Sequence, residues 1–195
     1  MTHILLDAKA GLGNPRDWRL SKCADFHSAN KGKRGNRMNV TLKEAREIIE
    51  VMVQYVSEDR FVSLREPGLP FSVAVVDAAG VLVSLDRMDG AAPLTARVSI
   101  NKAYTAIDWR TDTKVIRERL FTGPSPLDTT TINRDMAWFG EPRNAPIPGG
   151  VLLRGKDGVI VGAIGTSGRT AEEDEELARV GEKAYQEILK RKSRK

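Results

Sequence analysis

Apolar residues recur every three or four positions between residues 42 and 56, and this spacing predicts an amphipathic helix. The stripe consists of Leu42, Ala45, Ile48, Ile49, Met52, Val53 and Val56. Just before it, Thr41-Leu-Lys-Glu44 matches a capping box, in which Thr41 and Glu44 each satisfy a backbone amide of the other. We therefore expect a helix from about residue 42 to about residue 60.

Two later segments alternate between apolar strands and tight turns. The first reads Phe71-Ser-Val-Ala-Val-Val-Asp77, then Ala-Ala-Gly80, then Val81-Leu-Val-Ser-Leu-Asp-Arg87. The second reads Gly149-Gly-Val-Leu-Leu-Arg-Gly155, then Lys-Asp-Gly158, then Val159-Ile-Val-Gly-Ala-Ile-Gly165. A glycine between two apolar runs can adopt the positive φ of a hairpin turn. We therefore expect two β-hairpins, each followed by an exit that contains glycine.

Three more helices are predicted, over about residues 94–108, 113–120 and 171–190, the last one opened by the capping box Thr170-Ala-Glu-Glu173. A segment with five prolines, residues 123–148, separates the second and third of them. The order is helix, hairpin, two helices, irregular segment, hairpin, helix. Because hairpin-joined strands are antiparallel, this order predicts an α+β fold, with one antiparallel sheet packed by long N- and C-terminal helices.

Charge and composition divide the chain of 195 residues into two parts. Residues 1–39 hold eight Lys or Arg against three Asp, whereas the remaining residues hold 23 of each sign. We interpret residues 1–38 as a flexible basic extension and residues 39–195 as the folded domain. Because no aromatic residues are interleaved with the cations after residue 189, a nucleic-acid partner is not expected.

Cysteine content and hydropathy bear on the compartment. The single cysteine, Cys23, excludes an internal disulfide framework and a cysteine-based metal cluster. No stretch approaches the roughly 20 apolar residues of a membrane span. We therefore expect a cytoplasmic protein without a membrane span.

An ordered set of five motifs resembles the GlcG/HbpS family, whose domain is also found at the C-terminus of PduO-type proteins. The motifs are Ser72-Val-Ala-Val-Val-Asp77 with Gly80, Met88-Asp-Gly-Ala91, Lys102-Ala-Tyr-Thr-Ala106, Gly149-Gly150, and Gly162-Ala-Ile-Gly165 with Ser167-Gly168. The resemblance covers about residues 39–190. It implies a profilin-like or PAS-like antiparallel sheet and a homo-oligomer. Some members of this family are described as haem-binding or haem-degrading.

Lys102 is the candidate catalytic residue, because it sits among apolar residues of a predicted helix and inside a family motif. A partly buried lysine can have a lowered pKa and act as an acid, a base or an anion anchor. The structural alternatives are a lysine whose ammonium reaches solvent, or a buried ion pair with Asp77 or Asp89.

The candidate ligand-binding residues are expected where the two hairpin exits meet the helix that carries Lys102. Residues 143–150 could form a lid over this place. The candidates are Arg87, Met88, Asp89, Gly90, Tyr104, Thr105, Gly149, Gly150, Gly165, Ser167 and Gly168.

Cofactor and metal chemistry find less support. Haem is possible, but the two histidines, His3 and His27, both precede residue 39, so residues 39–195 offer no histidine ligand. No metal site is expected. The glycines of residues 162–168 could cradle a phosphate, but the acidic run Glu172-Glu-Asp-Glu-Glu176 that follows would repel one. Close packing of the strand is the preferred explanation for these glycines.

Three functions remain open from the sequence. The resemblance implies a binding protein for a small ligand, either a small organic acid or a tetrapyrrole such as haem. A second possibility is a cofactor-independent lyase or isomerase in the catabolism of a small or aromatic acid, with Lys102 as the acid/base or electrostatic group. The third is an oligomeric accessory protein of a sensor. The sequence does not name the ligand.

Overall fold

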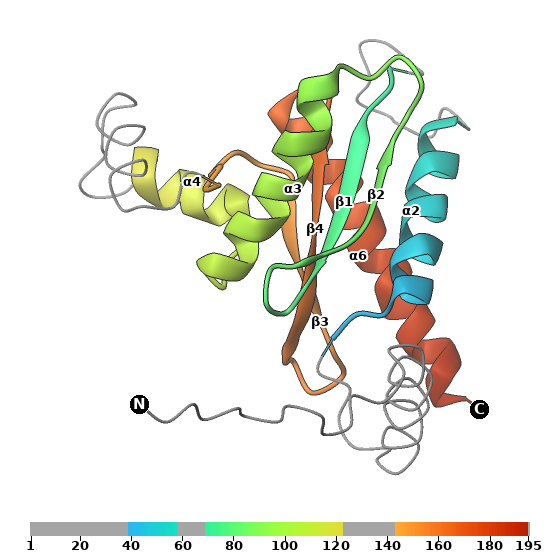
Figure 1. Ribbon diagram of the computed structural model, residues 1–195. Coiled ribbons are helices and arrows are strands. Elements are labelled where there is room, and N and C mark those ends of the chain that lie inside the picture. Colours follow the sequence, from blue (N-terminus) through green and yellow to red (C-terminus); the bar gives the residue numbers. More distant parts are fainter. Residues whose placement is uncertain (1–38, 58–68, 123–142, 195) are drawn as a thin grey trace, which may run out of the picture. The chain divides into compact units, whose positions relative to one another are not determined.

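The computed structural model describes residues 39–57, 69–122 and 143–194, and these form an α+β unit (Figure 1). This confirms the predicted fold class. The elements are α2 (Leu42–Ser57), β1 (Ser72–Asp77), β2 (Leu82–Arg87), α3 (Pro93–Asp108), α4 (Thr113–Thr122), β3 (Gly150–Arg154), β4 (Ile160–Ser167) and α6 (Ala171–Ser193). The predicted basic extension and most of the proline-rich segment lie outside the described residues.

The four strands form one antiparallel sheet in the order β2-β1-β4-β3. The two predicted hairpins are therefore side by side, joined through β1 and β4. Ser72 at the start of β1 pairs with Ser167 at the end of β4 and with Arg87 at the end of β2. This register brings the exits of both hairpins to the same end of the sheet.

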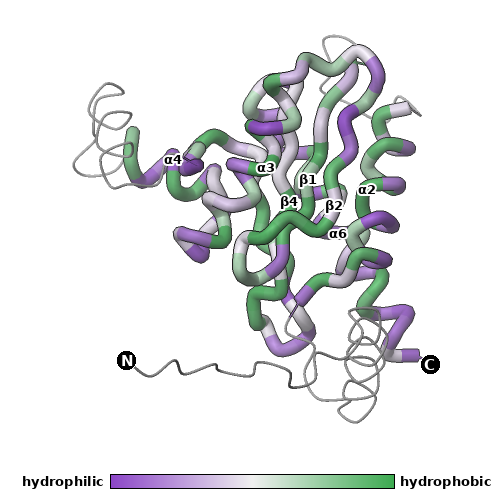
Figure 2. The backbone as a smooth tube through the Cα atoms, viewed as in Figure 1, coloured by the Kyte–Doolittle hydropathy of each residue, from purple (hydrophilic) through white to green (hydrophobic). Residues whose placement is uncertain are grey.

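Helices α2 and α6 pack on one face of the sheet and on each other (Figure 1). The alternation of side chains along a strand directs Val73 and Val75 of β1 and Ile164 of β4 into this layer. The apolar stripe of α2 meets them there, and Ile48 and Met52 are fully buried. Figure 2 shows hydrophobic (green) and hydrophilic (purple) positions alternating along α2. This layer is the larger of the two hydrophobic cores.

Helix α3 covers the opposite face of the sheet, and small side chains form most of that core. Its buried members are Val76, Ala103, Ala106, Leu152 and Ala163. A Cβ atom on Gly165 would lie 1.9 Å from the carbonyl oxygen of Ser99, and one on Gly150 would lie 2.4 Å from that of Lys102. Glycine at these two positions therefore permits the backbone of α3 to approach the sheet, in agreement with the predicted close packing.

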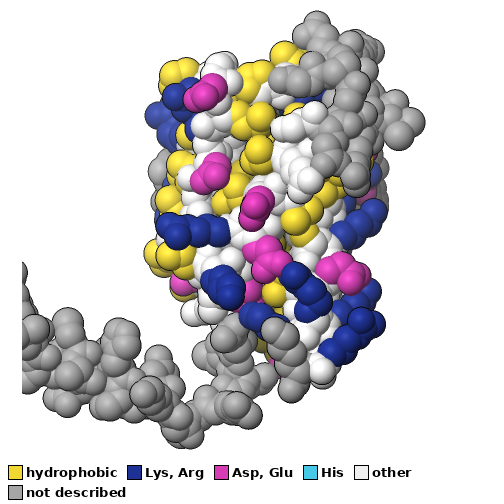
Figure 3. Space-filling view, turned by 90° about the vertical axis from the view of Figure 1, so that its right-hand side faces the viewer, with side chains coloured by type: hydrophobic (Ala, Val, Ile, Leu, Met, Phe, Trp, Pro, Cys, Tyr) yellow, Lys and Arg dark blue, Asp and Glu magenta, His cyan; other side chains and the backbone are white. Residues whose placement is uncertain are grey.

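Both predicted capping boxes are present. Thr41 N donates to Glu44 Oε2 at 2.7 Å, and the Thr170 and Glu173 pair opens α6 in the same way. The last helix ends at Ser193 rather than near residue 190, because its final turn is held by ion pairs to α2. Lys192 bonds to the buried carboxylate of Glu44 at 2.6 Å, and Arg191 pairs with Glu47. Figure 3 shows several Lys and Arg side chains towards the lower end of the face that it presents.

None of the helices in residues 39–57, 69–122 and 143–194 is both long and apolar enough to cross a membrane.

Candidate functional site

Lys102, a residue of α3, forms a buried ion pair with Asp174 of α6. The distance from Lys102 Nζ to Asp174 Oδ2 is 2.6 Å, and the two side chains are 2% and 3% exposed. Burial raises the pKa of Asp174 to about 6, against the lowering influence of the Lys102 ammonium. Burial likewise lowers the pKa of Lys102, against the raising influence of Asp174. The pair is therefore a charged contact that its surroundings disfavour.

The partner of Lys102 differs from the two carboxylates indicated by the sequence. Asp77 Oδ1 instead accepts the backbone N–H groups of Ala79 and Val81, both at 2.9 Å, and so stabilises its own turn. Asp89 is exposed in the link between β2 and α3. The carboxylate that pairs with Lys102 belongs to Asp174, in the acidic run at the start of α6. From the sequence, this run was interpreted only through its effect on the helix dipole and on a phosphate.

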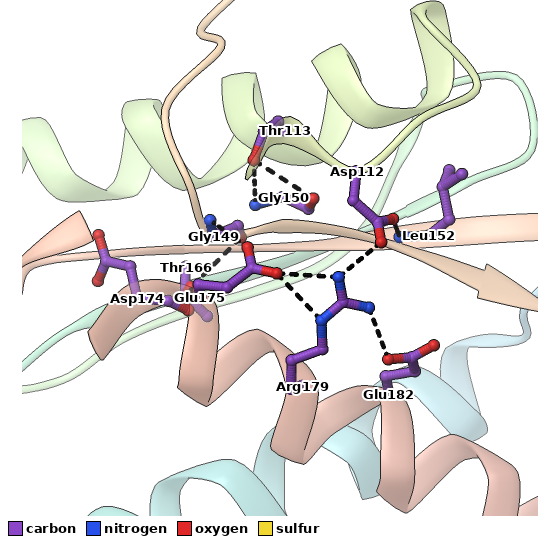
Figure 4. A network of polar contacts seen from close by, with 10 residues as sticks. All are labelled: Asp112, Thr113, Gly149, Gly150, Leu152, Thr166, Asp174, Glu175, Arg179 and Glu182. Carbon is purple, nitrogen blue, oxygen red and sulfur yellow. Dashed lines mark hydrogen bonds and ion pairs between the residues drawn. The ribbon is translucent and has the colours of Figure 1, made fainter. Parts of the chain in front are cut away.

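A second polar network is centred on Arg179 of α6 and lies beside this pair (Figure 4). Its guanidinium bonds to Asp112 Oδ2 at 2.6 Å, to Glu175 Oε1 at 3.0 Å and to Glu182 Oε2 at 2.9 Å. The other carboxylate oxygen of Glu175 accepts the N–H of Gly149 at 3.0 Å. The network therefore links α6 to the entry of β3 and to the loop before α4.

The same network protects the free edge of β3. Gly150 N donates to Thr113 Oγ1 at 2.8 Å, and Leu152 N donates to Asp112 Oδ1 at 2.9 Å (Figure 4). Unpaired amides on an edge strand invite pairing with another strand. Asp112, in the loop before α4, and Thr113, at the start of α4, accept hydrogen bonds from these amides. The backbone amides of Gly149 and Gly150 are therefore both bonded within the fold.

Residues 143–149 run along α3 and contact two of the candidate residues. Thr105 Oγ1 accepts the N–H of Ala145 at 2.7 Å, and the guanidinium of Arg143 lies 3.8 Å from the centre of the Tyr104 ring. Tyr104 also packs against the turn at Gly80. Tyr104 and Thr105 therefore hold the segment predicted as a lid and lie away from the hairpin exits.

The hairpin exits form a separate polar group at the start of α3. Arg87, Ser72 and Ser167 are aligned across three strands, so their side chains leave the sheet on the same face. Ser72 Oγ lies 2.6 Å from Thr95 Oγ1 in the first turn of α3, which identifies that face as the α3 side. The guanidinium of Arg87 donates to the carbonyl oxygen of Ala91 in the link to α3.

The start of α3 adds an uncompensated positive dipole to this group. Ala92 provides no side-chain cap, and the first turn holds no acidic residue. A helix N-terminus of this kind favours an anion. Arg87 is exposed and Ser167 is 8% exposed, so a cation and a hydroxyl lie at the same end of the sheet as this terminus.

The remaining candidates near the exits have mainly backbone or packing roles. Met88 packs against the larger core, on the side away from α3. Gly90 has a φ of 84°, and Gly168 has a φ of 139° and lies against Pro70 and Phe71. The structure therefore separates the predicted residues into three places: the buried position of Lys102, the contacts of Tyr104 and Thr105 with residues 143–149, and the hairpin exits around Arg87.

Besides Asp174, sequence reasoning missed three polar residues at these places. Ser72 and Thr95 join the Arg87 group, and Thr166 Oγ1 donates to the backbone oxygen of Asp174 at 2.5 Å beside Lys102. Ser72 could have been found, because strand alternation places it on the same face as Ala74 and Val76. Thr166 sits within the glycine motif, but its sequence position does not indicate a contact with α6.

Ligands for a metal ion or a haem iron are scarce in the described residues. These residues contain no group of three or more His, Cys, Asp or Glu side chains that could hold a metal ion. They also contain no histidine. The Met88 thioether packs against the core, and the Tyr104 ring lies under Arg143. The described residues thus offer an iron atom neither a histidine nor a cluster of acidic side chains.

A family model described as haem degrading protein HbpS-like matches residues 40–183 of the chain. The chain belongs to the HbpS-like family. This confirms the resemblance found in the sequence motifs.

Two curated proteins are similar to this HbpS-like chain. An uncharacterized 15.0 kDa protein from the dhaT-dhaS intergenic region of Citrobacter freundii is 33% identical over 124 residues. The match covers 63% of this chain and 81% of that protein. GlcG of Escherichia coli K12 is 36% identical over 96 residues, 49% of this chain and 63% of GlcG.

Solved structures support the same HbpS-like fold. The crystal structure of Klebsiella pneumoniae protein ORFY superposes with a TM-score of 0.62 at 24% identity, covering 79% of this chain and 96% of that one. A crystal structure of a PduOC–haem complex gives a TM-score of 0.60 at 20% identity, covering 75% and 94% of the two chains. At these identities the likeness bears on the fold.

Proposed function

We propose that the protein binds a small molecule that carries a carboxylate, either an organic acid or the propionates of haem, at the end of the sheet where β2 and β4 finish. The observation that carries the proposal is the row of Arg87, Ser72 and Ser167 beneath the uncapped start of α3. Ligand sites combine a concave surface with a few convergent polar groups, and this end of the fold supplies such groups.

Arg87, Ser167 and the start of α3 each have a chemical role in this proposal. The guanidinium of Arg87 presents parallel N–H donors that match the two oxygens of a carboxylate. Ser167 adds a hydroxyl donor, and the start of α3 adds the positive end of its dipole. Asp89, which is exposed nearby, would act against a second negative charge and so favours a monocarboxylate or a well-separated pair.

Family membership supports a ligand-binding role, and the structural relative PduOC was crystallised with haem. When bound, haem would supply the redox chemistry of its iron. The chain's own part would be to hold the propionates at Arg87 and Ser167. The described residues contain no histidine, the usual proximal ligand of haem iron, so iron ligation is not included in the proposal.

The test uses haem and pyruvate as probes with the full-length chain. Haem binding is followed by absorbance titration and pyruvate binding by calorimetry. Replacement Arg87→Gln should weaken the bound probe about tenfold, which corresponds to about 1.4 kcal/mol for a charged hydrogen bond. Arg46→Gln, which removes an exposed arginine from α2, is the matched control and should leave binding unchanged. Equal binding by native protein and Arg87→Gln, or no saturable signal with either probe, contradicts the proposal.

The catalytic role of Lys102 stays a prediction. Its ammonium faces Asp174 and is 2% exposed, so a substrate could reach it only if the ion pair opened. Homo-oligomerisation and a sensor-accessory role also stay predictions. Light scattering on the native protein would measure the oligomer size directly.

A further inference from the structure

A concave surface lies at the other end of α3, away from Arg87. It is a groove of about 390 Å³ between the β1–β2 turn, the end of α3 and the turn between β3 and β4. Its apolar lining consists of Ala78, Ala79, Ile107, Val159 and Ile160. Ile107 and Ile160 also pack against the smaller core, so the floor of the groove is anchored in the fold. The volume falls within the range typical of small-molecule sites.

Arg110 is one of the residues that line this groove, and its backbone has an unusual conformation. Its φ of 51° is the only positive value at a non-glycine position in the described residues. Arg110 N donates to the Ile107 oxygen at 3.1 Å, and Thr111 N donates to the Ala106 oxygen at 3.1 Å. This pair of bonds is the Schellman motif, in which glycine is the usual residue at the position of Arg110. Because backbone strain at a non-glycine residue often occurs at functional sites, we infer a functional role for the Arg110 side chain.

The guanidinium of Arg110 makes no hydrogen bond or ion pair with the rest of the described chain. The two acidic residues of the adjacent turns are engaged locally. Asp77 accepts two backbone N–H groups of its turn, and Asp157 Oδ1 accepts the N–H of Val159 at 3.2 Å. Asn39 Oδ1 similarly accepts the N–H of Ala78 at 3.3 Å, which leaves the Asn39 amide nitrogen as a further donor at the rim.

We propose that this groove is a second binding site, which takes a small apolar monocarboxylate such as an aromatic acid. The ring or alkyl part lies on Ile107, Ile160 and Val159, and the carboxylate pairs with Arg110. Val159 is 48% exposed, so covering it with a ligand removes apolar surface from water. The positive φ of Arg110 fixes the direction in which its side chain leaves the end of α3. In this proposal the guanidinium holds the carboxylate while the apolar part of the ligand lies on the floor of the groove.

Benzoate is the probe, observed through ¹³C-labelled isoleucine methyl groups of the full-length protein. Benzoate should shift the methyl signals of Ile107 and Ile160 in a saturable way. Benzamide, which has the same shape without the charge, should bind about tenfold more weakly, because it loses the charge-assisted pair. Arg110→Gln should reduce benzoate affinity to the level of benzamide. Arg110→Lys should recover only part of the loss, since a lysine lacks the planar fork.

Two controls make the result specific to this groove. Arg46→Gln should bind benzoate like the native protein. Arg87→Gln, which removes the arginine at the other end of the fold, should also leave the Ile107 and Ile160 shifts unchanged. Unchanged affinity in Arg110→Gln overturns the groove proposal. So does a benzoate response that disappears in Arg87→Gln, which would instead support binding at the hairpin exits.

Discussion

Lys102 of α3 and Asp174 of α6 form an ion pair with 2.6 Å between Nζ and Oδ2. The two residues are 72 positions apart in the sequence, and their helices cover opposite faces of the sheet. Removing one partner of such a buried pair leaves the other charge without compensation, at a typical cost of about 3–5 kcal/mol. We therefore predict that Lys102→Met lowers the free energy of unfolding by about 3 kcal/mol, measured by urea denaturation.

The double replacement Lys102→Met with Asp174→Leu separates loss of the pair from loss of packing. Because it leaves no unpaired charge, it should be more stable than Lys102→Met alone. If Lys102→Met costs less than about 1 kcal/mol, the pair contributes little to the fold, as exposed pairs do.

The raised pKa of Asp174 also predicts a specific pH dependence of the protein's stability. Its pKa is raised from 3.8 to about 6 by burial, so the folded state binds its proton more tightly than the unfolded state does. The contribution of this group is complete below the unfolded pKa and is lost as the pH rises through the folded pKa. Stability from Asp174 should thus fall between about pH 4 and about pH 6, by about 3 kcal/mol for a shift of this size.

The measurement is the difference in unfolding free energy between native protein and Asp174→Asn, taken across this pH range, because the other titrating groups largely cancel in the difference. A flat difference contradicts the raised pKa. If Asp174→Asn does not fold, carboxyl ¹³C NMR of native protein gives the Asp174 pKa directly.

Much of the fold follows from local patterns in the sequence, whereas the contacts of Lys102 do not. The stripe of α2, the two hairpins and both capping boxes each depend on residues within a few positions of one another. Asp174 lies 72 positions beyond Lys102, and the structure alone shows which carboxylate of the acidic run turns inward. The same limit applies to Arg179 and Asp112, which contact each other only after α6 has packed beside β3.

Glycine at position 165 is predicted to be essential for the approach of α3 to the sheet. In Gly165→Ala the new Cβ would lie 1.9 Å from the Ser99 oxygen, so the helix must move away from β4. We expect a loss of about 3 kcal/mol or more of unfolding free energy, at the upper end of overpacking effects. Gly158→Ala is the control, because it has a φ of 76° but no atom within 4 Å. It should lose only about 1 kcal/mol from backbone strain.

Asp112 is predicted to protect the edge of β3. In Asp112→Ala the N–H of Leu152 loses its acceptor and Arg179 loses one of its three carboxylates. Hydrogen exchange at the Leu152 amide should then accelerate by at least about tenfold, because the edge of β3 opens more readily. Glu182→Ala removes another carboxylate of Arg179 without touching β3, and it should leave Leu152 exchange unchanged. Equal protection in Asp112→Ala and native protein contradicts this role.

Arg110 provides a test in which stability and binding should change in opposite directions. Glycine at this C-terminal position of α3 removes the penalty of a Cβ atom at a φ of 51°, which is about 1 kcal/mol. Arg110→Gly should therefore unfold at a higher urea concentration than native protein, while it loses the benzoate response of the groove. Arg110→Gln keeps the Cβ atom and should lose binding without any gain in stability. If Arg110→Gly is no more stable than Arg110→Gln, the arginine backbone stores no strain, and the argument from strain to function at this groove fails.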